Sequence, residues 1–343
     1  MTTPSDVAAL ETEIFPAIRA LHERIRGAVW EACRQRSTAE LSEVAADDVG
    51  DTIYAVDRIS EELLVDAFGR LAAQVGGIVL VAEGVHGGRL VLPHGLSEAA
   101  ARYVIIVDPI DGTRGLMYQK RSAWILTGVA LNRSGTVRLS DIALAVQTEI
   151  PLVKQYLADE LWAFRGQGAR ARRVNLLNGD VQALALAPSR ADNIEHGYAM
   201  LSRFFPGGRD ELAAIDDELV AAVLGPPKSG KAACFEDQYA SSGGQLYELM
   251  IGHDRFNADL RPLLSGLLAK RGQATGLCCH PYDVCTLLIA EELGVLLTGP
   301  DGGALDAPLA VEPDVAWVGY ANAALRARLE PPLLATLSRR GLL

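Results

Sequence analysis

The sequence has no hydrophobic run of about 18 residues, the length that a membrane-spanning helix needs, so we expect no contact with a membrane. It is also short of basic residues, because 32 Lys and Arg stand against 43 Asp and Glu, for a net charge of −11. Such an acidic chain is a poor partner for a nucleic-acid polymer, whose phosphates need Lys and Arg. A disordered chain is excluded too, since 49% of the residues are apolar and only 22% are charged. The 343 residues are enough for one large or two ordinary domains.

Cysteine is scarce, and its spacing excludes two kinds of site. The five cysteines are an odd number in a long chain, so we expect no disulfide framework, and no Cys-x-x-Cys pair that would bind zinc occurs. We interpret the adjacent Cys278 and Cys279, which precede His280, as small buried hydrophobic residues rather than a soft-metal cluster. The first residues lack the basic start and apolar run of a secretory signal, which favours a cytoplasmic protein.

Hydrophobic periodicity predicts helices followed by an antiparallel sheet in the first half. Apolar residues at spacings of three and four indicate helices over 5–35, which Pro16 would split or kink, and over 59–74. The Gly- and His-containing stretch 84–101 predicts a loop or flap. Closely spaced strands favour antiparallel pairing. The predicted strands cover 78–81, 103–107, 122–131, 142–147 and 152–166.

The second half alternates helices and strands, which indicates an α/β arrangement. We expect the two halves, 1–185 and 186–343, to meet near residue 185 without a flexible linker, because no Ser/Gly-rich spacer occurs there. The predicted elements of the second half are helices over 209–223, 241–252 and 282–293 and strands over 295–297 and 315–318.

The most informative stretch places two carboxylates three residues apart directly after the strand 103–107. Its sequence is Asp108-Pro109-Ile110-Asp111-Gly112-Thr113. Hard oxygen ligands that converge in this way suit Mg²⁺ and phosphate. If the chain turns helical after Gly112, the free N–H groups of the first turn form a cradle for a phosphate.

Further carboxylates are candidates for the same site, although each is a weak signal alone. Glu83 follows the strand 78–81, so neighbouring placement would bring it to the same sheet edge. Asp283 begins a predicted helix, where an aspartate is more often a favourable N-terminal charge than a ligand. Asp57 and Glu61 share one helical face, which is most often a solvated face.

Taken together, these blocks resemble the inositol monophosphatase and fructose-1,6-bisphosphatase superfamily of magnesium-dependent, lithium-sensitive phosphatases. The order and approximate spacing of the blocks agree with the family over most of the chain. The matching blocks are the 108–113 stretch, Val56-Asp57-Arg58-Ile59-Ser60-Glu61, Val81-Ala82-Glu83, Tyr282-Asp283-Val284, and Gly294-Val295-Leu296-Leu297-Thr298 followed by Gly303-Ala304-Leu305-Asp306.

The resemblance implies a role for each matching residue. Glu83, Asp108 and the Ile110 carbonyl would hold one Mg²⁺, and Asp108, Asp111 and Asp283 a second, in a site of two or three ions. Thr113 and Glu83 would orient the attacking water, with Asp57 behind Thr113. The N–H groups of Gly112 and Thr113 would hold the phosphate.

The resemblance also implies the architecture and the partners. The expected fold is a layered α-β-α-β-α sandwich with a mostly antiparallel N-terminal sheet. The expected activity is Mg²⁺-dependent hydrolysis of a phosphate monoester of a small polyol or sugar, by a homodimer. A 3′-phosphonucleotide or sugar bisphosphate phosphatase of the same fold is an alternative, and so is a non-catalytic binder of metal and a phosphorylated ligand.

The residues that would contact the substrate depart from the family pattern. Gly84 stands where the family often has a second Glu, and Arg114-Gly115-Leu116 replaces its polar and aromatic residues. Ser242 and Asp259 fall near positions that contact the alcohol part of the substrate. Arg114, Lys120 and Arg121 would either meet a second anionic group or form a solvated basic patch.

One competing motif points to a different class of enzyme. The stretch Gly225-Pro226-Pro227-Lys228-Ser229-Gly230-Lys231-Ala232 nearly matches a nucleotide-binding P-loop. However, Ala232 lacks the hydroxyl that binds Mg²⁺, two prolines remove N–H donors, and the preceding segment is predicted to be helical. We therefore interpret it as a loop, whose Lys228 or Lys231 could face the active-site cleft.

Overall fold

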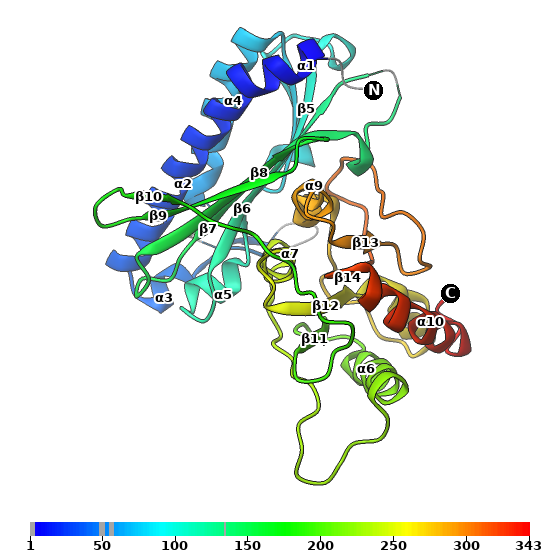
Figure 1. Cartoon of the computed structure of the whole chain (residues 1–343). Coiled ribbons are helices and arrows are strands. Elements are labelled where there is room, and N and C mark those ends of the chain that lie inside the picture. Colours follow the sequence, from blue (N-terminus) through cyan, green and yellow to red (C-terminus); the bar gives the residue numbers. More distant parts are fainter. Residues whose placement is uncertain (1–3, 48–51, 55–57, 134) are drawn as a thin grey trace.

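The chain folds into alternating layers of helices and sheets (Figure 1). The computed structural model describes residues 4–47, 52–54, 58–133 and 135–343. Within these residues an eight-stranded sheet and a four-stranded sheet are separated by helices and covered by helices on their outer faces. This order confirms the expected α-β-α-β-α sandwich. The helices are α2 (Phe15–Gln35) and α4 (Arg58–Val75) outside the large sheet, α7 (Ser242–Ile251) and α9 (Leu287–Glu291) between the sheets, and α6 (Arg209–Leu224) and α10 (Ala323–Arg339) outside the small sheet.

The long N-terminal helix is continuous but changes its winding before the proline. The short α1 (Pro4–Ala9) runs through a π-helical turn (Leu10–Ile14) into α2. Pro16 lies in the first turn of α2, directly after the π-helical turn, and has no N–H to donate to that preceding turn. The helix predicted over 5–35 is thus confirmed, and a π turn takes the place of a break.

The large sheet is mostly antiparallel, as expected. Its order is β10-β9-β8-β7-β6-β5-β3-β4, and only the β3–β5 pair is parallel. Helices cover both faces of the central strands, and every residue of β5 is therefore buried. The strands are β3 (Ile78–Ala82), β4 (Arg89–Leu92), β5 (Tyr103–Asp111), β6 (Ala123–Leu131), β7 (Ile142–Ile150), β8 (Leu157–Phe164), β9 (Ala169–Asn175) and β10 (Val181–Ala183).

Two expectations need correction. The stretch 84–101 is not only a loop, because it contains β4, a short edge strand that pairs with β3 and is partly exposed. The helix predicted over 282–293 is broken into a 3-10 turn at Pro281–Val284 and the short α9. The break lies where this segment presses on the large sheet, since the Cys285 carbonyl would be only 2.8 Å from a Cβ at Gly128.

The small sheet is built from the second half of the chain. Its order is β11-β12-β14-β13, and the helices α7 and α9 pack between it and the large sheet, so residues from both halves share one hydrophobic core. The described helices include none that is long and apolar enough to cross a membrane. The strands are β11 (Tyr198–Leu201), β12 (Asp254–Asp259), β13 (Leu296–Thr298) and β14 (Trp317–Tyr320), and the remaining elements are α3 (Thr38–Leu41), the β1–β2 hairpin (Val44–Asp47 and Thr52–Tyr54), α5 (Thr113–Met117) and α8 (Ser265–Lys270).

Candidate metal centre

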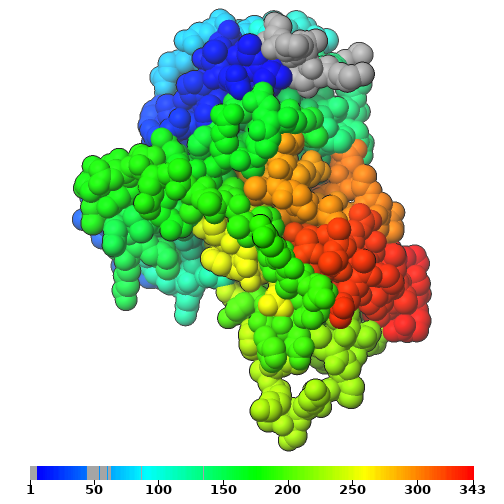
Figure 2. All heavy atoms as spheres, viewed as in Figure 1, coloured from blue at the N-terminus to red at the C-terminus, as the bar shows by residue number. Residues whose placement is uncertain are grey.

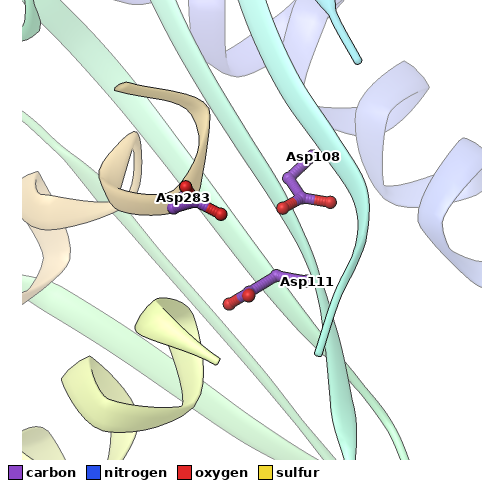
Figure 3. A group of neighbouring side chains, drawn as sticks. All are labelled: Asp108, Asp111 and Asp283. Atoms are coloured by element: carbon purple, nitrogen blue, oxygen red, sulfur yellow. The ribbon is translucent and has the colours of Figure 1, made fainter. Parts of the chain in front are cut away.

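Three aspartates converge where the last residues of β5 face the 3-10 turn before α9. Asp108 and Asp111 lie at the end of β5, and Asp283 lies in the turn Pro281–Val284. Their carboxylates point toward one another (Figure 3), with oxygen atoms that all lie within 4.8 Å of each other. We call this group the aspartate trio.

An irregularity in the pairing of β5 with β6 explains why β5 presents two carboxylates to the same side. The pairing of β5 with β6 shifts register between Asp108 and Asp111, so the alternation of side chains is interrupted there. The Ile110 N–H donates to Asp108 Oδ1 at 2.9 Å and fixes that carboxylate. Gly112 then adopts a left-handed conformation (φ 92°), and the chain turns into α5. The helical turn after Gly112 is therefore present.

The start of α7 holds Asp111. Ser241 Oγ donates to Asp111 Oδ2 at 2.7 Å, and the Gly243 N–H donates to the same oxygen at 2.6 Å. Ser241 also caps α7, since its hydroxyl accepts the Gly244 N–H at 2.9 Å. The positive end of the helix dipole thus faces a carboxylate of the trio. Asp283 is fixed in a similar way by the His280 N–H at 2.5 Å.

The trio is buried and strongly unfavourable electrostatically without a cation. Asp108 and Asp111 are only 3% and 5% exposed. Burial, followed by repulsion from Asp111, Asp283 and Glu83, raises the pKa of Asp108 well above its usual range. Burial and repulsion from Asp283 raise the pKa of Asp111 to about 8. Among the described residues, no Lys or Arg forms an ion pair with the trio. The donors are all oxygen atoms, so the group fits a hard divalent cation such as Mg²⁺.

Most of the predicted site residues line one cavity of about 70 Å³ around the trio. Glu83 reaches it because β3 and β5 are parallel with Ala82 beside Val107, which places Glu83 next to Asp108. Thr113 Oγ1 donates to the Ile110 carbonyl at 2.8 Å. Asp57 lies outside the described residues. The predicted residues that line the cavity are Glu83, Asp108, Ile110, Asp111, Gly112, Thr113, Arg114, Ser242 and Asp283.

Asp259 does not line this cavity but supports a residue that does. It is fully buried at the end of β12 and accepts hydrogen bonds from the guanidinium of Arg261, including Nε at 2.8 Å. Arg261 lines the cavity and stacks over the ring of Phe204, 4.4 Å from its centroid. Phe205 lies between this group and Arg114, whose guanidinium is 5.1 Å from its centroid. Asp259 therefore lies behind Arg261 rather than on the wall of the cavity.

Sequence reasoning missed several residues of the cavity. No pattern marked Phe204 and Phe205, which follow β11 as a bare aromatic pair. Arg261 could have been found, because an Arg two residues after a strand-end Asp can pair with it. Ser241 could have been found as the N-cap of α7, although its contact with Asp111 could not.

The remaining basic candidates lie elsewhere. Lys120 and Arg121 are not among the residues around the trio, and Arg121 pairs with Asp237. The P-loop-like stretch follows the helix α6 rather than a strand, in a segment that protrudes from the body of the molecule (Figure 2). Neither Lys228 nor Lys231 lines the cavity of the trio.

Several solved structures share the fold of this chain. The Leishmania major fructose-1,6-bisphosphatase is similar with a TM-score of 0.68 and 14% identity, over 98% of this chain and 99% of that one. The extragenic suppressor protein SuhB from Bartonella henselae is similar with a TM-score of 0.61 and 14% identity, over 93% and 98%. A hypothetical protein of Pyrococcus horikoshii with similarities to inositol-1 monophosphatase gives a TM-score of 0.58 and 16% identity, over 92% and 96%.

The assignment of the chain to a family rests on its sequence. No curated protein matches the chain. The sequence model of the inositol monophosphatase family, in contrast, matches residues 10–196, which include Glu83 and the whole 108–113 stretch. Because this match covers more than half of the chain, the protein belongs to the inositol monophosphatase family.

Proposed function

We propose that the chain is a Mg²⁺-dependent phosphatase that hydrolyses a phosphate monoester of a small polyol or sugar. The observation that carries the proposal is the aspartate trio, which shares one cavity with Glu83, Thr113 and the first turn of α5. Membership of a phosphatase family supports a hydrolase in general. The geometry adds a site where a cation and a phosphate can bind side by side.

The oxygen atoms of the cavity would hold two or three ions. Glu83, Asp108 and the Ile110 carbonyl would bind one, and Asp108, Asp111 and Asp283 a second. When bound, Mg²⁺ would supply positive charge for the phosphoryl oxygens and would make a bound water more acidic. Asp108 belongs to both sets, so it is the residue whose loss the site tolerates least.

The chain itself would position the phosphate and the water. The N–H groups of Gly112 and Thr113 lie at the start of α5, where the phosphate would bind. Glu83 and the Thr113 hydroxyl would orient the attacking water, with Asp57 behind Thr113. Phosphate-monoester hydrolysis needs accelerations up to about 10²¹, and a general base supplies only about 10²–10⁴. Most of the effect must therefore come from fixed charge and positioning.

The cavity wall beside the trio would contact the leaving group of the substrate. Arg114 lines it directly with Ser242, and Asp259 contributes by holding Arg261. Two guanidinium groups on this wall favour a second candidate substrate, a sugar bisphosphate or a 3′-phosphonucleotide, whose second phosphate would face them. The fructose-1,6-bisphosphatase among the similar structures is consistent with this alternative.

We further expect the protein to be a homodimer in the cytoplasm. Sedimentation equilibrium would measure the mass of the assembly.

The decisive experiment is phosphate release from a panel of esters: inositol monophosphates, fructose-1,6-bisphosphate, a 3′-phosphonucleotide and histidinol phosphate. Each is assayed with Mg²⁺, with chelator, and with Asp108→Asn. The matched control is Asp66→Asn, an exposed aspartate on α4. We expect turnover that requires Mg²⁺ and Asp108 but not Asp66. Metal binding without any turnover would instead indicate the non-catalytic binder.

A further inference from the structure

A second cavity lies beside the metal centre and shares none of its lining residues. Its volume is about 500 Å³, within the range of small-molecule sites. It opens between the ends of β6, β7 and β8 and the helix α7, on the same edge of the large sheet as the trio. Tyr239 lines this cavity, and the next residues, Ala240, Ser241 and Ser242, line the cavity of the trio. One stretch of backbone thus forms the wall between the two.

Hydrogen bonds between two loops fix the mouth of the second cavity, which we call the rim. Gln119, just after α5, has a left-handed backbone (φ 53°), which is unusual for a residue other than glycine. Its side chain donates to the Leu116 carbonyl at 2.9 Å and accepts the Val153 N–H at 2.8 Å. Gln155 closes the second loop by accepting the Leu152 N–H at 3.1 Å. These bonds hold the loops 118–122 and 152–157 against each other.

The rim brings two lysines together. Lys120 adjoins Gln119 and Lys154 adjoins Val153, so the hydrogen bond between Gln119 and Val153 sets the two side chains on facing loops of the same cavity. Within the part of the chain that the structure describes, neither lysine forms an ion pair.

The two arginines of the cavity are already paired with carboxylates. Arg173 binds Asp159 through two hydrogen bonds of 2.6 and 2.7 Å, and Arg121 pairs with Asp237 and lies 3.6 Å from Glu248. The two exposed lysines have no such partner among the described residues, so a bound anion or solvent balances their charge at the mouth of the cavity.

The interior is aromatic and carries little free negative charge. Trp124 and Tyr247 contact each other with ring centroids 4.6 Å apart, and the Tyr247 hydroxyl donates to Asp159 at 2.6 Å. Glu149 accepts the Ser122 hydroxyl at 2.7 Å and the Asp159 N–H at 3.0 Å. Burial raises the pKa of Glu149 to about 7, so this carboxyl is largely protonated at slightly acid pH. An anion held by the lysines at the mouth would therefore turn its ring, and not its charged group, toward this interior.

We propose that this cavity is a binding site for a small organic anion, with a phosphate or carboxylate held by Lys120 and Lys154 and a ring packed against Trp124 and Tyr247. The site is separate from the metal centre, because the two cavities have no lining residue in common. Its occupancy does not depend on Mg²⁺ or on the proposed hydrolysis.

The test uses phenylphosphonate, whose C–P bond a phosphomonoesterase does not hydrolyse, and benzoate as the carboxylate counterpart. Binding is measured by calorimetry on the full chain in chelator, where the bare trio repels anions. We expect binding of at least one probe, with a change in tryptophan fluorescence from Trp124. The tighter probe shows whether phosphate or carboxylate is the preferred group.

The variants decide where the probe binds. The double variant Lys120→Ala/Lys154→Ala should weaken binding at least tenfold. The matched control Lys228→Ala/Lys231→Ala, on the protruding segment after α6, should bind as the wild type does, and so should Asp108→Asn. Unchanged melting temperatures show that the lysine variants are folded. No binding of either probe, equal affinity in the Lys120/Lys154 variant, or loss of binding in Asp108→Asn would overturn the proposal.

Discussion

Removing one charge from the aspartate trio should stabilise the metal-free protein. Asp108→Asn is the best choice, because the amide oxygen can still accept the Ile110 N–H that Asp108 Oδ1 accepts at 2.9 Å. Two unit charges within 4.8 Å repel each other by about 3.5 kcal/mol at an effective dielectric constant of about 20. Partial protonation relieves some of this repulsion in the wild type. We therefore expect a gain of roughly 2–4 kcal/mol for Asp108→Asn in chelator at pH 8.

The pH dependence follows from the raised pKa values. The pKa of Asp111 is about 8 in the folded protein against 3.8 as the ordinary value. The folded state thus binds more protons than the unfolded state between these pH values, so stability is lost as the pH rises from about 4 to 8 and levels off above. At pH 5 Asp111 of the wild type is mostly protonated, and the variant should show little gain. The difference between variant and wild type should grow steadily toward pH 8.

Thermal and denaturant unfolding in chelator measure the effect, which corresponds to roughly 3–6 °C in melting temperature. Asp259→Asn provides the opposite control. Asp259 is also a fully buried aspartate, but it is paired with Arg261, so its neutralisation should cost about 3–5 kcal/mol at both pH values. With Mg²⁺ in excess the order should reverse, because the wild type gains binding energy that Asp108→Asn loses. If Asp108→Asn is no more stable than the wild type at pH 8 in chelator, the electrostatic reasoning about the trio is wrong.

Three further predictions concern the support of the site and of the core. Ser241→Ala should lower turnover about tenfold, because Asp111 loses a charged hydrogen bond, and should reduce stability by about 1 kcal/mol through the lost cap; kcat and denaturation measure the two effects. Gly243→Ala should raise the Mg²⁺ concentration needed for half-maximal activity, since its Cβ would lie 2.9 Å from Asp111 Oδ2, whereas Gly266→Ala, with no atom within 4 Å, should leave it unchanged. Burial lowers the pKa of His22 to about 3, so its contribution to stability should fall by about 2 kcal/mol from pH 6.5 to 5, a loss that His22→Gln should not show in denaturation experiments.

The acidic side chains of the candidate site could be placed together from the sequence because their signals are local or depend on sheet edges. Asp108 and Asp111 directly follow an apolar strand, and the resemblance added Asp283 from the second half. Glu83 was predicted from the expectation that neighbouring strands end at one edge, and the parallel β3–β5 pair places it there. The role of Asp57 stays a prediction.

The parts that sequence reasoning did not reach depend on long-range packing. β4 is a partly exposed edge strand with one partner, so its residues lack the strong apolar pattern of β5. The break before α9 arises from the close approach to Gly128, which no local pattern encodes. The stacking of Arg261 over Phe204 likewise forms only when β11 and β12 are side by side.

The trio brings together aspartates from two distant parts of the chain. Asp111 ends a strand of the large sheet, whereas Asp283 lies about 170 residues later, in the turn that leads to the layer between the sheets. A divalent ion bound by both closes that long stretch of chain into a loop, as a covalent cross-link would, but reversibly. Without the ion, repulsion between the carboxylates of the trio would favour separation of the end of β5 from the turn before α9. In the proposed enzyme the cation concentration would therefore set how firmly the two sheets are held together, and proteolysis between the sheets should be fastest in chelator.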